Sequence, residues 1–274
     1  MPSEASYPLG SSDAEDERLV VQARVVRPWT DRFLRAGGLR PGMSVLDLGS
    51  GFGDVTLLAA EIVGPQGSVL GIDRDERILD KARRRAANER LSGTVSFEVA
   101  DLGEFRPAGS FDAVIGRFVL LYLEDPAAVL RHYTRFLRPG GVVIFHEIDF
   151  TNSNPSWPPC PAWDDAYRLI ARVYRAVGAV PDFGPRLSST YLAAGLPRPT
   201  VEAIIPVIDG PESPVLDWGA GTLRSIQPLL DRMGASLPPG IDYDNLADHW
   251  RKAIIANGVQ IQGPSQFGAW TRVP

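Results

Sequence analysis

The sequence predicts a doubly wound α/β fold with a mostly parallel sheet, and three features carry that prediction. Apolar segments alternate with amphipathic, helix-like segments across residues 41–150, and this alternation specifies a parallel sheet with helices on its faces. The apolar segments are hydrophobic almost without interruption, which indicates strands that are buried on both faces. A glycine-rich turn follows the first of them at residues 49–53, and such sheets bind ligands beyond the carboxyl ends of their strands.

The individual strands and helices follow from this pattern. We expect strands at 43–49, 68–73, 95–102, 111–118 and 141–150. We expect helices between them at 54–64, 75–91 and 125–141. The last of these helices has a proline at its start and glycines at its end, which is the distribution that helices favour. Beyond residue 150 we expect helices at 162–178, 186–196, 213–234 and 242–257, and strands at 200–208 and 265–273.

The chain divides into four predicted segments. They are a disordered tail at 1–12, an N-terminal helical cap at 13–40, a ligand-binding Rossmann-like core at 41–150, and helical lid elements with the closing strands of the sheet at 151–274. Small polar residues and prolines predict the disorder of the tail. Pro28 is expected to bend or split the helix of the cap. The helices after residue 150 are too numerous for the faces of the sheet, so we expect some of them to form a lid.

Composition narrows the class of partner. The 274 residues are 44% hydrophobic and 22% charged, which is ordinary for a soluble globular protein. A net charge of -5 argues against nucleic acid as a partner, because its binders carry a basic face. We interpret the arginine-rich run at 80–90 as a solvated helix face. The N-terminus does not resemble a signal peptide, and no apolar stretch approaches the roughly 20 residues that span a bilayer. We therefore expect a cytoplasmic protein without a membrane partner.

No metal is expected. The single cysteine, Cys160, excludes an internal disulfide and a cysteine-based metal cluster. The histidines, aspartates and glutamates show no cluster with ligand spacing. The sequence therefore predicts chemistry that does not depend on a bound ion.

The spacing of the glycine turn indicates the kind of ligand. A dinucleotide site has the pattern G-x-G-x-x-G, whereas Gly49, Gly51 and Gly53 occupy alternate positions. Asp54 stands where the third glycine of a dinucleotide site would be, and its charge lies where a pyrophosphate would bind. The turn therefore favours a cationic or zwitterionic ligand.

Two further carboxylates follow the next predicted strands. Asp73 ends the second strand, where an acid accepts hydrogen bonds from both ribose hydroxyls. Asp101 ends the third strand, where an acid can accept from an exocyclic amine such as that of adenine. Each alone has a simpler explanation as a helix N-cap. Their occurrence at successive strand ends beside the glycine turn favours a nucleoside-containing ligand.

Several motifs in this order closely resemble the class I S-adenosylmethionine-dependent methyltransferases. They are VLDLGSGFGD, GIDRDERIL, FEVADL, FDAVIGRFVLLYLEDP and LRPGGVVIFHE, and the resemblance covers about residues 40–150. The N-terminal extension at 17–42 and the late GAWTR resemble a bacterial, especially actinobacterial, group of small-molecule methyltransferases. The resemblance implies S-adenosylmethionine as the cofactor.

The resemblance also implies a set of cofactor contacts. Gly49, Ser50, Gly51 and Gly53 are expected to pack the methionine part of the cofactor against backbone, Asp73 to hold the ribose, Arg74 to lie beside the adenosine, and Asp101 with Leu102 to hold the adenine. Arg117, at the end of the fourth strand, is expected to face the carboxylate of the cofactor or the substrate. The family commonly has a small or polar residue at that position, so the role of Arg117 rests on its place alone.

Methyl transfer requires alignment of two reactants and exclusion of water more than one fixed catalytic residue. His146 and Glu147, at the end of the fifth strand, are the candidate catalytic residues, and strand alternation directs their side chains to opposite faces. Tyr122, Trp157 and Trp163 are the candidate lining of a substrate pocket, which suits an apolar or aromatic acceptor.

The sequence predicts an enzyme that methylates a small organic molecule in secondary metabolism. We expect segments 13–36, 151–180 and 211–260 to close over the cofactor as the lid. Three alternatives stay open: the same fold and cofactor with another reaction such as cyclisation, a protein or RNA acceptor, and a protein that only senses the cofactor. A homodimer is also left open.

Overall fold

The computed structural model describes residues 13–152, 155–208, 210–237 and 241–274; the predicted disordered tail lies outside them. These residues form two compact units. The sheet unit comprises Pro28–Ile148, Phe183–Ile204 and Gln266–Pro274. The helical unit comprises the described residues up to Arg27, with Asp149–Asp182 and Ile205–Ser265. Helix α1 (Asp13–Ala36) contributes to both units and has Pro28 in its interior.

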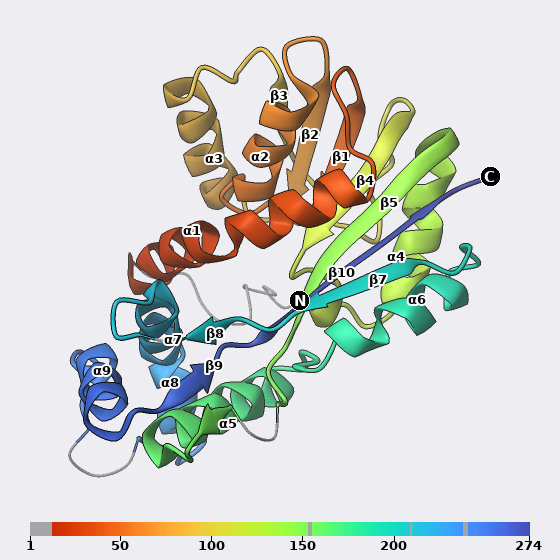
Figure 1. Ribbon diagram of the computed structural model, residues 1–274. Helices are drawn as coiled ribbons and strands as arrows, with labels where there is room; N and C mark the ends of the chain where they lie inside the picture. The colour runs from red at the N-terminus through yellow and green to blue at the C-terminus, as the bar shows by residue number, and fades with distance from the viewer. Residues whose placement is uncertain (1–12, 153–154, 209, 238–240) are drawn as a thin grey trace. The chain divides into compact units, whose positions relative to one another are not determined.

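The sheet unit contains a seven-stranded sheet in the order β3-β2-β1-β4-β5-β10-β7, visible edge to edge in Figure 1. Its strands are β1 (Ser44–Leu48), β2 (Ser68–Asp73), β3 (Val95–Val99), β4 (Phe111–Arg117), β5 (Leu137–Asp149), β7 (Thr200–Ile204) and β10 (Ser265–Arg272). The neighbours from β3 to β5 pair in parallel, and β10 pairs with β7 antiparallel. The predicted doubly wound fold is confirmed. Strand order reverses at β1, so the end of β1 is the place where this fold binds ligands.

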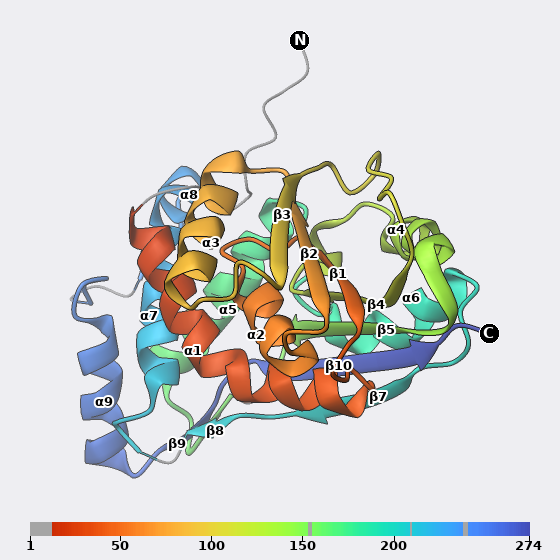
Figure 2. The same cartoon turned by 90° about the horizontal axis from the view of Figure 1, so that it is seen from above.

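Helices cover both faces of this sheet. They are α2 (Asp54–Val63), α3 (Glu76–Asn88), α4 (Pro126–Tyr133), α6 (Leu187–Ala193) and the second part of α1, with the short 3₁₀ turns η1 (Leu120–Tyr122), η2 (Thr134–Phe136) and η3 (Gly184–Arg186). One apolar core joins Leu34 of α1 and Leu58 of α2 to Val45, Ile115 and Ile144 of the central strands. Figure 2 shows α2 and α1 lying along the sheet. This packing fixes the start of α2 at the carboxyl edge of the sheet.

Three predicted elements differ from the structure at or near a proline. The helix predicted at 213–234 is divided at Ile226 into α7 (Pro214–Ser225) and α8 (Gln227–Arg232), which has Pro228 in its first turn. The helix predicted at 125–141 ends at Tyr133 and is followed by η2, and β5 begins at Leu137. Pro139 and the left-handed Gly140 (φ 77°) exclude a helix from the rest of the predicted range. The strand predicted at 200–208 is divided into β7 and β8 (Val207–Ile208), which belong to different sheets. Pro206 lies between them and has no amide hydrogen to donate to a strand ladder.

The helical unit combines the first part of α1 with α5 (Pro161–Ala176), α7 (Pro214–Ser225), α8 (Gln227–Arg232) and α9 (Leu246–Asn257). It also holds a small antiparallel sheet in the order β6 (Ser156–Trp157), β9 (Gln260–Gln262), β8. None of the described helices has the length and apolarity needed to cross a membrane.

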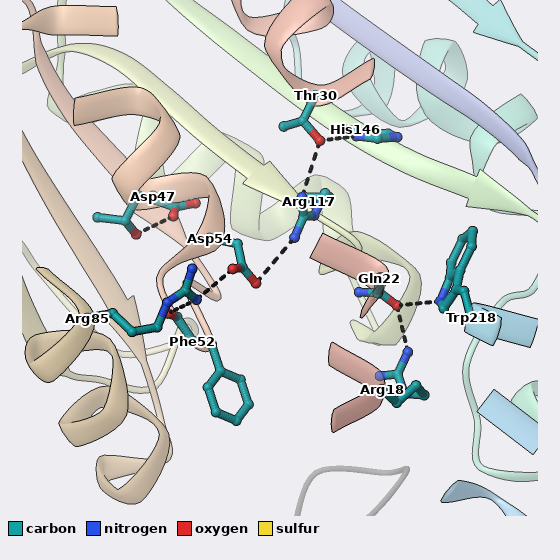
Figure 3. Close-up of polar contacts among 12 residues, drawn as sticks. Arg18, Gln22, Thr30, Asp47, Phe52, Asp54, Arg85, Arg117, His146 and Trp218 are labelled. Carbon is teal, nitrogen blue, oxygen red and sulfur yellow. Dashed lines mark hydrogen bonds and ion pairs between the residues drawn. The ribbon is translucent and has the colours of Figure 1, made fainter. Parts of the chain in front are cut away.

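Aromatic packing forms the core of the helical unit. The rings of Trp163 and Trp250 meet edge to face with centroids 4.8 Å apart. Gly219 of α7 lies against both rings, since a Cβ atom there would be 3.2 Å from Trp250. Trp218 of the same helix donates from Nε1 to Oε1 of Gln22 at 3.3 Å, which joins α7 to α1 (Figure 3).

Candidate functional site at the carboxyl edge of the sheet

The glycine turn between β1 and α2 has a left-handed backbone at three positions. Gly49, Gly51 and Gly53 have φ values of 66°, 52° and 79°, which residues with side chains rarely adopt. A Cβ atom on Gly49 would lie 2.7 Å from Val119, and one on Gly53 would lie 3.0 Å from Phe97. At Gly51 a Cβ atom would meet nothing within 4 Å. Two glycines therefore serve internal packing, and Gly51 leaves open space for a ligand to approach the backbone.

Asp73 lies beside this open position. Its Oδ2 accepts a hydrogen bond from the Gly51 amide at 3.0 Å, and its Oδ1 accepts from the Asp75 amide at 3.1 Å. The side chain is half-buried, and each carboxylate oxygen has capacity for a further donor. The structure thus brings together the two features from which the sequence predicts a ribose site.

The other predicted nucleoside contacts follow β2 and β3. Asp101, which follows β3, is exposed and accepts a hydrogen bond at Oδ1 from the Gly103 amide at 2.7 Å. Leu102 is half-buried and Arg74 is exposed. Because β1, β2 and β3 are neighbours in the sheet, these residues follow adjacent strand ends.

The carboxylate of Asp54, at the start of α2, contacts two arginine side chains. Its Oδ1 accepts from Arg85 at 2.6 Å, and its Oδ2 lies 3.7 Å from Nη2 of Arg117. Two guanidinium groups therefore neutralise the carboxylate. Arg85 belongs to the run at 80–90, so the interpretation of that run as a solvated face is wrong for this residue.

Arg117 begins a buried chain of polar contacts that the sequence does not predict (Figure 3). Its Nη1 donates to the hydroxyl of Thr30 at 3.3 Å, and that hydroxyl lies 3.0 Å from Nδ1 of His146. Nε2 of His146 lies 2.9 Å from Oε1 of Gln266. An amide oxygen is an acceptor only, so Nε2 carries the proton and Nδ1 accepts from Thr30. Together with the ion pair between Arg117 and Asp54, these polar contacts link α2, β4, α1, β5 and β10.

His146 is neutral at physiological pH in this arrangement. The side chain is 2% exposed, and burial together with the charge of Arg117 lowers its pKa to about 3. Both ring nitrogens already have partners. These contacts describe a positioning residue, and they give no support to His146 as a proton acceptor for a substrate.

Glu147 organises the turn that follows β4. Its fully buried Oε1 accepts from the amides of Val119 and Leu120 at 3.1 and 2.8 Å. Burial raises its pKa to about 8, against the backbone donors that lower it. Phe118, at the start of the turn, has a left-handed φ of 53°. This turn carries Tyr122, so the contacts of Glu147 also indicate positioning, and a catalytic role for it stays a prediction.

The three aromatic residues predicted to line a substrate pocket have different surroundings. Tyr122 is half-buried in η1 of the sheet unit. Trp157 in β6 of the helical unit is 76% exposed. Trp163 is 4% exposed and belongs to the aromatic core described above. Packing therefore accounts for Trp163, whereas Tyr122 and Trp157 remain candidates for contact with a substrate.

Sequence reasoning missed Asp47, which lies in β1 under the glycine turn. Oδ2 accepts from the hydroxyl of Thr56 at 2.6 Å, while Oδ1 has no hydrogen-bond partner among the described residues. The buried hydroxyl of Ser50 likewise has none there. Burial raises the pKa of Asp47 to about 7. The signal was an acid inside the apolar run VLDL, where a charged group needs a specific reason to be buried.

The described part of the chain contains no group of three or more histidine, cysteine, aspartate and glutamate side chains arranged to hold a metal ion.

Comparison with known proteins shows that the chain is similar to methyltransferases. A family model described as a methyltransferase domain matches residues 39–174. Nocamycin O-methyltransferase of Saccharothrix syringae is 43% identical over 116 residues, which cover 42% of this chain and 41% of that protein. The ubiquinone/menaquinone biosynthesis C-methyltransferase UbiE of Ectopseudomonas mendocina is 33% identical over 156 residues, which cover 57% and 56%. The chain thus spans about half the length of the curated relatives it matches.

A solved structure supports the same fold. The crystal structure of a putative methyltransferase from Bacillus halodurans superimposes with a TM-score of 0.59 at 16% sequence identity, covering 89% of this chain and 98% of that one. At this identity the likeness concerns the fold.

Proposed function

The chain belongs to the class I S-adenosylmethionine-dependent methyltransferase family, and we propose that it transfers the methyl group of this cofactor to a small organic acceptor. One observation carries the proposal. The open backbone at Gly51 lies beside the Asp73 carboxylate, at the edge of the sheet where this fold binds nucleotides.

The residues at this edge fit the cofactor. The open position at Gly51 would receive the methionine part, with Gly49, Ser50 and Gly53 forming the rest of the turn. The Asp73 carboxylate would accept from the ribose hydroxyls. The predicted adenosine contacts are Arg74, Asp101 and Leu102, which follow the two adjacent strands.

Charge also fits this ligand better than a dinucleotide. The start of α2 carries Asp54, which pairs with Arg85 and Arg117, so a pyrophosphate would have to bind beside this carboxylate. The buried guanidinium of Arg117 near this edge is suited to the carboxylate of the cofactor. Asp47 and Ser50 place buried acceptor atoms beneath the turn, where a cationic amino group is favoured.

Methyl transfer requires little of the protein beyond the correct positioning of the reactants. When bound, S-adenosylmethionine supplies an electrophilic methyl group on an excellent leaving group. The chain therefore has to hold the acceptor in line and exclude water. We propose that Glu147 and His146 contribute by fixing the turn after β4 and the side chain of Arg117, and that a hydroxyl acceptor loses its proton to solvent or to a base on the acceptor side.

We propose an apolar or aromatic acceptor and a role in secondary metabolism. The half-buried Tyr122 and the exposed Trp157 support the acceptor class, because aromatic side chains line sites for such molecules. The names of two relatives refer to nocamycin and to ubiquinone and menaquinone biosynthesis, which supports a small molecule over a macromolecule. A cytoplasmic location and closure of the predicted lid segments belong to the same proposal.

Calorimetry and a labelling experiment test this function. We expect S-adenosylmethionine and its demethylated product to bind more tightly than NAD; tighter binding of NAD would refute the assignment. The protein is then incubated with methyl-labelled cofactor and either a panel of small phenols or bulk RNA. Label in a phenol, with an equal amount of demethylated cofactor, supports the proposal. Label in RNA supports a macromolecular acceptor, and conversion without demethylated cofactor supports the cyclisation alternative.

A further inference from the structure

One face of α3 contacts the glycine turn directly. Lys81, Ala82 and Arg85 are spaced so that they share a helix face. The Ala82 methyl lies 3.1 Å from where a Cβ atom of Gly53 would be, and Nζ of Lys81 lies 5.3 Å from the ring centroid of Phe52. The basic run at 80–90 therefore presents part of its surface to the turn.

Arg85 makes the strongest of these contacts. Its Nη1 donates to the Phe52 carbonyl at 2.9 Å and to Oδ1 of Asp54 at 2.6 Å (Figure 3). The side chain is 37% exposed and that of Asp54 is 15% exposed, so the pair is only partly screened by water. One guanidinium thus binds the backbone of the turn and the first side chain of α2 together.

The neighbouring arginines of the run behave differently. Arg84 is exposed. Arg83 pairs with Glu76 and Asp80 of its own helix at 2.7 and 2.8 Å. The contact with the cofactor turn is therefore specific to the helix position of Arg85, and Arg84 offers a matched control of the same residue type.

The turn needs such a restraint because of its composition. Glycine loses more conformational freedom on ordering than any other residue, and three of the residues from 49 to 53 are left-handed glycines. Within the turn, the Gly53 amide bonds the Ser50 carbonyl and the Gly51 amide bonds Asp73. Arg85 restrains the remaining part, from Phe52 to Asp54.

We propose that Arg85 is a positioning residue for the cofactor turn. It holds Phe52 and Asp54 so that the Gly51 backbone stays open beside Asp73. This inference rests on the proposed function, since it names the residue that shapes the same cofactor site from outside it. It also assigns a role to one residue of the basic run at 80–90.

The test compares Arg85→Ala with Arg84→Ala and Arg85→Lys in the full chain. Calorimetry measures the affinity for S-adenosylhomocysteine. We expect Arg85→Ala to weaken it about tenfold and Arg84→Ala to leave it within about twofold, because only Arg85→Ala removes charge-assisted hydrogen bonds in a partly screened site. Arg85→Lys is expected to lie between, at about threefold, since lysine keeps the positive charge but its ammonium group differs from the guanidinium in reach and geometry.

Hydrogen exchange of the ligand-free protein separates this inference from the proposed function. We expect faster amide exchange at residues 50–55 in Arg85→Ala than in Arg84→Ala or the wild type. Equal exchange and equal affinity in the two alanine variants would overturn the role of Arg85. A wild-type protein that binds no S-adenosylhomocysteine would refute the proposed function, whatever the exchange rates show about the turn.

Discussion

The two units of this protein hold their structure together by different means. In the sheet unit, polar groups are buried at one edge of the sheet, and Asp47, His146 and Glu147 are each less than 3% exposed. In the helical unit, tryptophan rings such as Trp163 and Trp250 form the centre of the packing. The sheet unit is therefore expected to respond to changes of charge and pH, and the helical unit to changes of side-chain volume.

The residues that we propose for the cofactor site lie in one of the two units. The glycine turn, Asp73, Asp54 and Arg117 all belong to the sheet unit. Their contacts are hydrogen bonds and ion pairs of defined direction, which position a ligand. The aromatic packing of the helical unit supplies stability. The following predictions test this division.

The largest expected effect is on the stability of the helical unit. Trp250 is 1% exposed, and its Nε1 donates to the Ala162 carbonyl at 3.0 Å. We expect Trp250→Ala to lower the free energy of unfolding by about 3–5 kcal/mol, as truncation of a large buried aromatic residue does. Urea denaturation followed by circular dichroism measures this change. Affinity for S-adenosylhomocysteine under native conditions is expected to stay within about threefold; a parallel loss of affinity would contradict the division between the units.

The second effect concerns the cofactor side. We expect Asp73→Ala to weaken S-adenosylhomocysteine binding by about 1.5–3 kcal/mol, the range for hydrogen bonds to a charged group. Asp80→Ala, which removes an exposed carboxylate of α3, serves as the control and is expected to have little effect. Calorimetry of both variants gives the comparison. A loss of less than tenfold in Asp73→Ala would show that the ribose is held by other residues.

The third effect is a dependence of stability on pH that originates in β5. Burial raises the pKa of Glu147 from 4.5 to about 8, so the folded chain keeps a proton that the unfolded chain releases. The stability from this group is complete below about pH 4.5 and is lost as the pH rises through about 8. His146 has the opposite sign. Its pKa falls from 6.5 to about 3, so its contribution is complete above about pH 6.5 and is lost as the pH falls through about 3.

Between pH 6.5 and 8 the contribution of Glu147 is separated from that of His146. In the wild type we expect the free energy of unfolding to fall across this range, by at most about 1.4 kcal/mol per pH unit for each proton. Asp47, whose pKa burial raises to about 7, contributes with the same sign in the lower part of the range. Glu147→Gln is expected to reduce this slope, most clearly between pH 7 and 8, and His146→Gln to leave it unchanged. Urea titrations at several pH values measure the slopes. Equal slopes for Glu147→Gln and the wild type would show that Glu147 does not hold this proton.

The sequence predicts the sheet unit well because its signals are local. Strands β1, β2, β4 and β5 each contain an apolar run, and the glycine turn with Asp73 lies within a few residues of the strands that position it. The edge strand β3 is the exception to the expected burial on both faces, because its residues are half-buried or exposed and include Ser96 and Glu98. Strands β6 and β9 of the helical unit have no such signal. They consist of two and three residues, and they exist because Ser156 pairs with Ile261 from a distant part of the chain.

The same limit applies within the site. Asp73 and Gly51 are predicted because the spacing of a motif carries their geometry. The contacts from Arg117 through Thr30 and His146 to Gln266 are not predicted. Thr30 and Gln266 come from elements near opposite ends of the chain, and neither belongs to a sequence motif that would indicate a role in the site. Arg85 was assigned to solvent for a related reason: helical spacing identifies the face it shares with Lys81 but not what lies against that face.

The smallest expected effect is that of Trp157→Ala, which we expect to change only the kinetics with the acceptor. Trp157 is 76% exposed in β6, so we expect Trp157→Ala to change the free energy of unfolding by less than about 0.5 kcal/mol. If the ring contacts the acceptor, the variant loses an interaction that stabilises the bound acceptor and the transition state equally. KM for the acceptor then rises while kcat is unchanged. We expect a rise of about three- to tenfold, with cofactor affinity within about twofold. Leu192→Ala, at an exposed apolar position of α6, is the control. Trp163→Ala is a poor substitute, because it disrupts the core. Unchanged acceptor kinetics in Trp157→Ala would assign acceptor recognition to residues of the sheet unit such as Tyr122.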